Sequence, residues 1–226
     1  MSNTPTSLSE RKVILSLCGG TGAWEEPYRQ HPDIYDVRNI TLPEHDVLTY
    51  QLPDEPIYGV LAAPPCTMFS DARTNAIMPR DLEFGMKIVK ACLDIIYVLQ
   101  YNTKSDQQKI PPLKFWALEN PWYGRLKWFL GKPAFEFSPW EFGDAYKKRT
   151  ALWGYFNEPI KTCVDINKVL TKEQIEKHKT NSQKLPKFDY MKSKDIHPET
   201  FGKLDRQARR SITPAGFSKA FYEANP

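Results

Sequence analysis

The feature that most constrains the fold is a helical pattern that lies between two apolar, β-prone segments. Residues 80–101 repeat apolar side chains at alternating steps of four and three, as one packed face of a helix does. The segments on either side, 57–63 and 114–121, are expected to be buried strands, and a proline follows or closes each of them. The helix face consists of Leu82, Met86, Val89, Leu93 and Ile96.

Similar strand patterns come earlier in the chain. Residues 11–17 are rich in β-branched side chains and leucine and run into a glycine turn that can open a helix. Residues 35–42 predict a second strand, and residues 45–50 a turn followed by a third. Strands that alternate with helices over the first 120 residues predict an α/β fold, in which right-handed crossovers build a mostly parallel sheet with helices on both faces.

Length and hydropathy indicate one principal domain. At 226 residues the chain is long enough for one good-sized core. No apolar run approaches the roughly 20 residues of a membrane span, so no membrane partner is expected. The start, MSNTPTSLSERK, lacks the apolar stretch of a secretion signal, which favours a cytoplasmic protein.

Cysteine usage and charge narrow the classes further. The four cysteines are scattered, with no CxxC pair or histidine cluster, so neither a metal site nor a disulfide framework is expected. The formal net charge is +4, and basic residues gather in the later half, at 147–149, 161–194 and 206–210. Such a distribution suits a phosphate backbone, although a solvated lysine-rich surface would explain it equally well.

Unusual residues follow three of the expected strands. The first strand ends in CGGTG (18–22), the strand before the 80–101 helix ends in PPC (64–66), and the strand after that helix ends in ENP (119–121). Pro64 and Pro65 fix their own φ angles and remove two backbone donors, so Cys66 emerges on a rigid turn. Ligands of open α/β sheets bind at the carboxyl ends of the strands, and these residues are therefore expected to form a site.

In this order and spacing, the chain resembles the cytosine 5-methyltransferase family, which transfers methyl groups from S-adenosylmethionine to cytosine in DNA. It looks closest to the short members found in bacteriophages. Two later segments extend the resemblance to nearly the whole chain. The matching pieces are LCGGTGAW, HDV, PPCTMFS, LENP, YKKRTALWG (146–154) and RRSITPAGFSKAF (209–221).

The resemblance implies a Rossmann-like methyltransferase fold in three parts. Residues 1–156 would form the catalytic domain that binds S-adenosylmethionine, and residues 157–205 a small recognition lobe. Residues 206–226 would return to the catalytic domain. Because the lobe is far shorter than the family's usual recognition domain, sequence specificity is expected to be low or to depend on a partner protein.

The resemblance also assigns catalytic roles. Carbon 5 of cytosine is too weak a nucleophile to attack a methyl sulfonium, so the Cys66 thiolate would first add to carbon 6. A protonated Glu119, with its pKa raised by burial, would hydrogen-bond to ring nitrogen 3. Arg149 would donate to the carbonyl oxygen of the base or hold the cysteine loop, and its charge would help to keep the thiolate ionised. Asn120 would order the loops. Residues expected against the substrate are Pro65, Ser70 and Lys147.

For the cofactor, the glycine turn would approach the methionine moiety, Asp46 would accept a hydrogen bond from the adenine amino group, and Val47 would cover the adenine ring. The full set of cofactor residues that the resemblance implies is Leu17, Cys18, Gly19, Gly20, Thr21, Gly22, Asp46, Val47, Pro64 and Ser211. The sequence departs from the family pattern where Ser16 replaces the acid that usually ends the first strand, and where Arg38 and Asn39 stand near the end of the second.

Two alternatives to DNA methylation remain open at this point. The same catalytic residues would act equally on RNA, single-stranded DNA or a free cytosine nucleotide, which a small lobe would suit. A second alternative is a non-catalytic homologue that binds nucleic acid or a protein.

Overall fold

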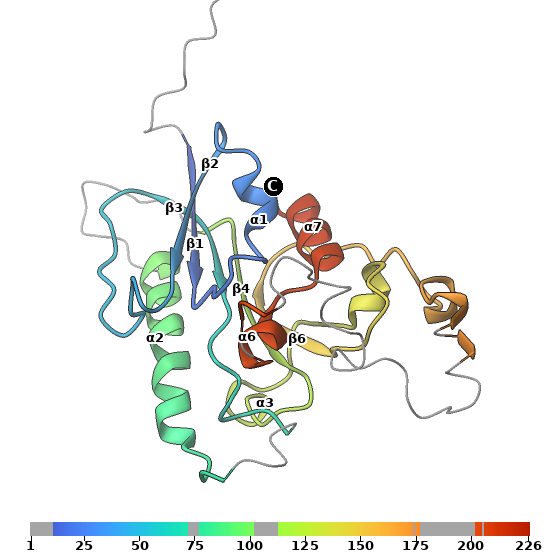
Figure 1. Ribbon diagram of the computed structural model, residues 1–226. Coiled ribbons are helices and arrows are strands. Elements are labelled where there is room, and N and C mark those ends of the chain that lie inside the picture. Colours follow the sequence, from blue (N-terminus) through green and yellow to red (C-terminus); the bar gives the residue numbers. More distant parts are fainter. Residues whose placement is uncertain (1–10, 72–76, 102–112, 174, 177–201, 205) are drawn as a thin grey trace, which may run out of the picture.

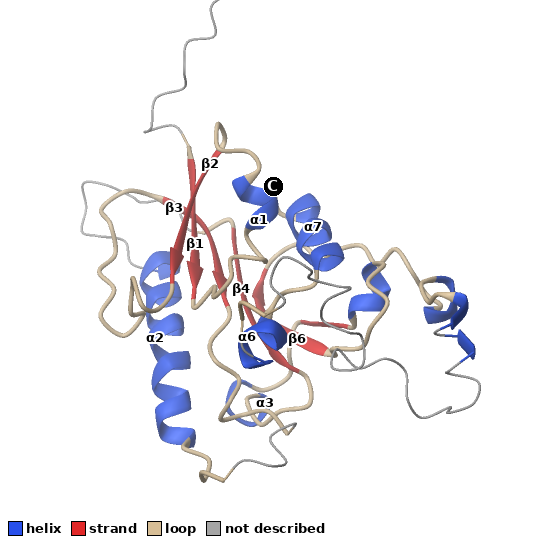
Figure 2. Cartoon of the chain, in the orientation of Figure 1, coloured by secondary structure: helices blue, strands red, loops and turns tan. Residues whose placement is uncertain are grey.

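The computed structural model describes residues 11–71, 77–101, 113–173, 175–176, 202–204 and 206–226. A six-stranded sheet forms the centre of the molecule (Figure 2). Its strands are β1 (Lys12–Leu17), β2 (Tyr35–Ile40), β3 (Ile57–Ala62), β4 (Phe115–Pro121), β5 (Phe135–Phe137) and β6 (Thr150–Tyr155).

The strands follow the order β2-β1-β3-β4-β6-β5. The first four strands pair in parallel, whereas β6 runs antiparallel to its neighbours β4 and β5. The protein is therefore a mixed α/β structure with a mostly parallel sheet, and the four strands expected at 11–17, 35–42, 57–63 and 114–121 are confirmed to within two residues at each end.

The prediction of a strand within residues 45–50 is wrong, because this segment consists of turns and irregular chain. The carboxylate of Asp46 accepts a hydrogen bond from the backbone N–H of Leu48 at 2.9 Å, and the Asp46 carbonyl accepts one from the N–H of Thr49 at 3.1 Å. These two bonds satisfy the local backbone within a turn, which competes with pairing in a sheet.

Helices cover both faces of the sheet. The helix α2 (Leu82–Tyr101) lies on one face, and α1 (Glu26–Arg29) and α7 (Ala215–Ala224) lie together on the other (Figure 1). The remaining helical segments are short: α3 (Lys127–Leu130), η2 (Pro139–Phe142), η3 (Ile166–Lys168) and α6 (Arg206–Ser211). Of the helices in the described residues, none combines the length and apolar character that a membrane span requires.

The predicted helix at 80–101 is confirmed as α2, which begins two residues later. Asp81 precedes it and accepts a hydrogen bond from the N–H of Phe84 at 2.8 Å, as a helix-capping residue does. Val89 and Ile96 of the predicted face are buried, and the other three members are partly buried against the same core.

Alternation along β1 divides the core into two clusters. Val13, Leu15 and Leu17 belong to the cluster that packs against α2, whereas Ile14 belongs to the one that packs against α7. Successive side chains of a strand point to opposite faces, so a short apolar strand supplies both cores at once. Phe217 and Phe221 are the fully buried side chains that α7 adds.

The segment expected to form a recognition lobe, residues 157–205, lies largely outside the described residues, which omit 174, 177–201 and 205. Within the described part, η3 begins after Asp165, whose carboxylate accepts a hydrogen bond from the N–H of Asn167 at 3.0 Å. The structure therefore describes the sheet, its helices and the loops at its edge.

Candidate active site at the carboxyl edge of the sheet

Topology brings two of the unusual loops together. From β1 the chain crosses to β2 on one side, and it later returns to β3 on the other side of β1. The strand ends remain paired, since the N–H of Ala63 donates to the carbonyl of Leu17 at 2.9 Å. Such a switch point is where open α/β sheets bind ligands, and both the glycine turn (18–22) and the cysteine loop (64–71) begin there.

The glycine turn leaves β1 through unusual backbone angles. Cys18 has φ of 56°, and it is the single residue other than glycine with positive φ in the described part of the chain. Its N–H still donates to the carbonyl of Ile40 at the end of β2, at 2.8 Å. A non-glycine residue in this region stores about 1–3 kcal/mol of strain, a cost that is commonest at functional sites.

One side of the glycine turn is tightly packed and the other is open. A Cβ atom at Gly19 would lie 2.2 Å from the hydroxyl oxygen of Ser16 and 2.7 Å from Oδ1 of Asn39. At Gly20, where φ is 56°, a Cβ atom would meet no heavy atom within 4 Å. Asn39 donates to the carbonyl of Gly20 at 3.2 Å, and Thr41 accepts from its N–H at 3.3 Å. The turn is thus anchored to the end of β2 and accessible at Gly20.

Beneath this turn lies Glu25, which the sequence analysis did not single out. The side chain is fully buried, and one carboxylate oxygen pairs with Arg29 at 3.1 Å. Burial raises the pKa of Glu25, while hydrogen bonds from its own backbone, from Ser16 and from Arg29 oppose the rise. No local pattern distinguishes Glu25 from the exposed Glu26 beside it, so only the packing of the turn identifies it.

The cysteine loop begins with a tight turn. The N–H groups of Phe69 and Ser70 both donate to the carbonyl of Cys66, at 2.9 and 2.8 Å. Pro64 is buried and Pro65 exposed, as the expected presentation of Cys66 requires. The Cys66 side chain itself is partly buried.

Residues from distant positions hold the cysteine loop in place. The amide of Asn120, at the end of β4, donates to the carbonyl of Pro64 at 3.0 Å, which agrees with the expected role of Asn120 in ordering the loops. Arg80 donates to the carbonyls of Met68 and Ser70 at 2.9 Å each. The sequence analysis missed Arg80, because its partners are backbone carbonyls that carry no sequence signal.

Glu119 and Cys66 belong to one electrostatic neighbourhood. Burial raises the pKa of Glu119, and the nearby charge of Lys148 opposes the rise. Burial also raises the pKa of the Cys66 thiol, Glu119 raises it further, and Lys148 and Arg210 lower it. The direction of the Glu119 pKa agrees with the expectation, since burial outweighs the effect of Lys148.

Lys148 is the cation that affects the pKa of both Cys66 and Glu119, and the sequence analysis had not assigned it a role. Its ammonium group donates to the carbonyl of Ile212 at 3.1 Å and lies 3.5 Å from that of Ser211, where α6 ends. Unpaired carbonyls at a helix end attract a positive charge, so α6 helps to fix the lysine. The sequence analysis had assigned the role beside the thiol to Arg149, the next residue of the same KKR run.

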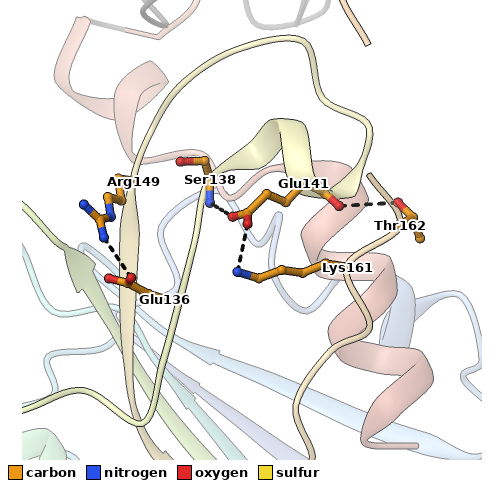
Figure 3. A network of polar contacts seen from close by, with 6 residues as sticks. All are labelled: Glu136, Ser138, Glu141, Arg149, Lys161 and Thr162. Carbon is orange, nitrogen blue, oxygen red and sulfur yellow. Dashed lines mark hydrogen bonds and ion pairs between the residues drawn. The ribbon is translucent and has the colours of Figure 1, made fainter. Parts of the chain in front are cut away.

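Arg149, which was expected to bind the base or the cysteine loop and to keep the thiolate ionised, has other partners in this structure. The Arg149 guanidinium pairs with Glu136 of β5 at 2.8 Å (Figure 3) and lies 4.6 Å from the ring centre of Trp122. The positive charges that lower the pKa of the Cys66 thiol are those of Lys148 and Arg210.

Figure 3 also shows how the chain after β6 is attached near this ion pair. Glu141 accepts hydrogen bonds from the N–H of Ser138 at 2.6 Å and from the ammonium of Lys161 at 2.8 Å. The Thr162 hydroxyl lies 3.5 Å from the Glu141 carbonyl, and the Thr162 N–H donates to that carbonyl at 2.9 Å. These contacts fix residues 161–162 against η2.

The remaining predicted cofactor residues differ in how far their side chains are exposed. Asp46 lies close to the glycine turn, since its charge raises the pKa of the Cys18 thiol. Burial also raises this pKa, whereas a hydrogen bond with Cys92 lowers it. Val47 is buried in the core that packs against α2, so it presents no open face to an adenine ring, contrary to the expectation. Thr21 and Ser211 are exposed, as is Lys147 on the substrate side.

Two further findings bear on the chemistry. Within the part of the chain that the structure describes, no three His, Cys, Asp or Glu side chains gather as a metal site would require. Comparison with models of known protein families finds no match, and comparison with curated proteins finds none either. A functional inference therefore depends on the residues and their placement.

Proposed function

We propose that this protein is an S-adenosylmethionine-dependent methyltransferase that methylates carbon 5 of cytosine in DNA through a covalent bond to Cys66. The supporting observation is the convergence of Cys66, Glu119 and Asn120 at one edge of the sheet. β3, which leads into the cysteine loop, and β4, which contains Glu119 and Asn120, are neighbours and pair up to Ala62 and Leu118. The mixed α/β sheet is compatible with the Rossmann-like fold that the proposal implies.

Cys66 would act as the nucleophile. Its thiolate adds to carbon 6 of the base, and the electrons of the 5,6 double bond move toward carbon 5, which then bonds to the incoming methyl group. Loss of the proton from carbon 5 and departure of the thiolate restore the double bond. The partly buried position of Cys66 at the strand end allows contact with a base while limiting contact with water.

Glu119 and Lys148 would manage charge during addition. Negative charge builds up on the ring, and a protonated Glu119 that donates a hydrogen bond to ring nitrogen 3 stabilises it. Burial of Glu119 supports this role because it disfavours the ionised carboxylate. Lys148 lowers the pKa of the Cys66 thiol against the effect of burial, which increases the fraction of thiolate.

The glycine turn suits the cofactor. The space over Gly20 is open, so a ligand can approach the backbone. Bound there, S-adenosylmethionine would supply the methyl group as an electrophilic sulfonium.

A mechanism-based trap tests the proposal. An oligonucleotide that contains 5-fluorocytosine, incubated with the protein and S-adenosylmethionine, should form an adduct that survives a denaturing gel, because fluorine at carbon 5 cannot leave as a proton does. Cys66→Ser should form none. Cys163→Ser, which changes another partly buried thiol away from the site, should trap as the wild type does.

Duplex, single-stranded, RNA and mononucleotide substrates should be assayed with labelled S-adenosylmethionine in parallel. Methyl transfer to cytosine with no trappable adduct, or full activity in Cys66→Ser, would contradict the proposal. Transfer confined to RNA or to a free nucleotide would support the alternative substrates instead.

A further inference from the structure

The segment that follows β4 presents an exposed surface of aromatic and basic side chains. Tyr123 and Trp128 are 62% and 69% exposed, which is unusual for large aromatic residues. We call it the aromatic–basic surface and define it by Trp122, Tyr123, Arg125, Lys127, Trp128 and Arg149.

The basic groups of this surface lie over the aromatic rings. Lys127 and Arg149 are 4.9 and 4.6 Å from the ring centre of Trp122. Arg125 lies 5.4 Å from the ring of Trp128, and Arg149 also lies 5.8 Å from that of Tyr123. These cation–π contacts hold the rings and the charges in one layer.

The basic side chains around the rings outnumber the carboxylates beside them. Residues 122–132 and 145–149 contain six Lys or Arg residues and no Asp or Glu. Two carboxylates from elsewhere offset part of it, since Asp71 lies 3.7 Å from Arg125 and Glu136 pairs with Arg149 at 2.8 Å. The excess of positive charge complements a phosphate backbone.

Backbone bonds attach this surface directly to the cysteine loop. The N–H of Asp71 donates to the carbonyl of Tyr123 at 3.1 Å, and the N–H of Arg125 donates to the carbonyl of Phe69 at 3.0 Å. Ser70 and Gly124 form a bridge between these two bonds. A chain bound on the aromatic–basic surface would therefore pass beside the loop that carries Cys66.

We propose that the aromatic–basic surface binds single-stranded DNA and directs it to the cysteine loop. Exposed rings stack on bases whose faces are free, whereas the bases of a duplex are already stacked on each other. The basic groups would contact the phosphates. Binding itself does not depend on the chemistry, but the assignment of DNA and of a target cytosine rests on the function proposed above.

Fluorescence anisotropy with labelled 12-nucleotide probes tests the surface. The wild type should bind single-stranded DNA at least tenfold more tightly than the matching duplex. Trp128→Ala and Tyr123→Ala should each weaken this binding by about tenfold, since one stacked base is lost. Tyr97→Ala, which removes a ring of 65% exposure on α2, serves as the matched control and should bind as the wild type does.

Lys127→Ala should flatten the dependence of affinity on salt, because fewer counterions are released. Equal affinity for duplex and single strand, tighter binding of the matching RNA, or unchanged binding in both aromatic variants would overturn the proposal. The Cys66→Ser variant separates this test from the function: it should bind single-stranded DNA normally and form no adduct. If the aromatic variants lose binding but the wild type transfers no methyl group, the proposed DNA-binding surface is supported and the proposed methyltransferase activity is refuted.

Discussion

The two loops that meet at the switch point are anchored differently. The glycine turn is attached to one element, since the partners of Gly20 are Asn39 and Thr41 at the end of β2, 19 and 21 positions away. The cysteine loop is attached to two, because Asn120 of β4 binds it from 56 positions away and Arg80, just before α2, binds it from 10 and 12 positions away. None of these partners is a neighbour in the sequence, so the anchoring of both loops becomes defined only in the folded protein.

The acids beside the two loops differ in their partners. Glu25 is buried beneath the glycine turn and pairs with Arg29, four positions along the chain. Glu119 forms no ion pair among the described residues, although Lys148 lies near enough to affect its pKa. A carboxyl engaged by its neighbours serves the structure, and one without a direct partner remains available to a substrate.

The largest expected effect separates these two acids. Glu119→Gln should lower turnover by about 100-fold or more, because a neutral amide donates a weaker hydrogen bond to the charge that develops on the ring. Nucleic-acid affinity should stay within about twofold of the wild type. Glu25→Gln should leave turnover nearly unchanged and alter the melting temperature instead. Labelled-methyl kinetics and calorimetry measure both quantities, and equal losses of turnover in the two variants would contradict the distinction.

Substitutions in the glycine turn should give the next largest effect. Gly19→Ala should destabilise the protein by about 1–3 kcal/mol, since the new methyl group would overlap the buried Ser16 hydroxyl. Gly20→Ala meets no neighbouring atom and should cost about 1 kcal/mol through its positive φ alone. Urea unfolding measures the difference. A Gly19→Ala variant as stable as the wild type would show that the turn relaxes easily.

The smallest effect concerns pH. Lys148 lowers the pKa of both Cys66 and Glu119, so Lys148→Gln should raise both. The Cys66 thiolate would then form at higher pH, and the Glu119 carboxyl would ionise at higher pH. The pH profile of adduct formation should therefore shift as a whole to higher pH. Lys147→Gln, at an exposed neighbouring position, is the control and should leave the profile in place. Superimposable profiles for all three proteins would exclude Lys148 from the site.

The sequence was sufficient to predict features that depend on local chemistry. The apolar spacing of residues 80–101 predicted α2, and the prolines before Cys66 predicted a strand end with an exposed turn. The strand expected at 45–50 failed because the Asp46 side chain stabilises a turn, an interaction that strand propensity does not describe.

Features that depend on long-range packing could not be predicted in this way. Whether Lys148 or Arg149 faces Cys66 depends on how the chain enters β6 and on the pairing of Arg149 with Glu136. Val47 was expected against a cofactor ring, but the burial of its side chain depends on how the turn settles on the core. Arg80 donates hydrogen bonds to backbone carbonyls, which look alike in every sequence, and lies 3.9 Å from the Asp71 carboxylate.

The position of α7 has a consequence for biosynthesis. Phe217 and Phe221 complete the core that also contains Ile14 and Phe115, and the carbonyl of Asn225 accepts a hydrogen bond from the Tyr28 hydroxyl at 2.8 Å. A chain emerges from the ribosome beginning with its N-terminus, so this face of the sheet stays uncovered until residues 215–224 have been made. The nascent protein exposes the aromatic side chains of this core during that interval, and uncovered apolar surface of this kind promotes aggregation.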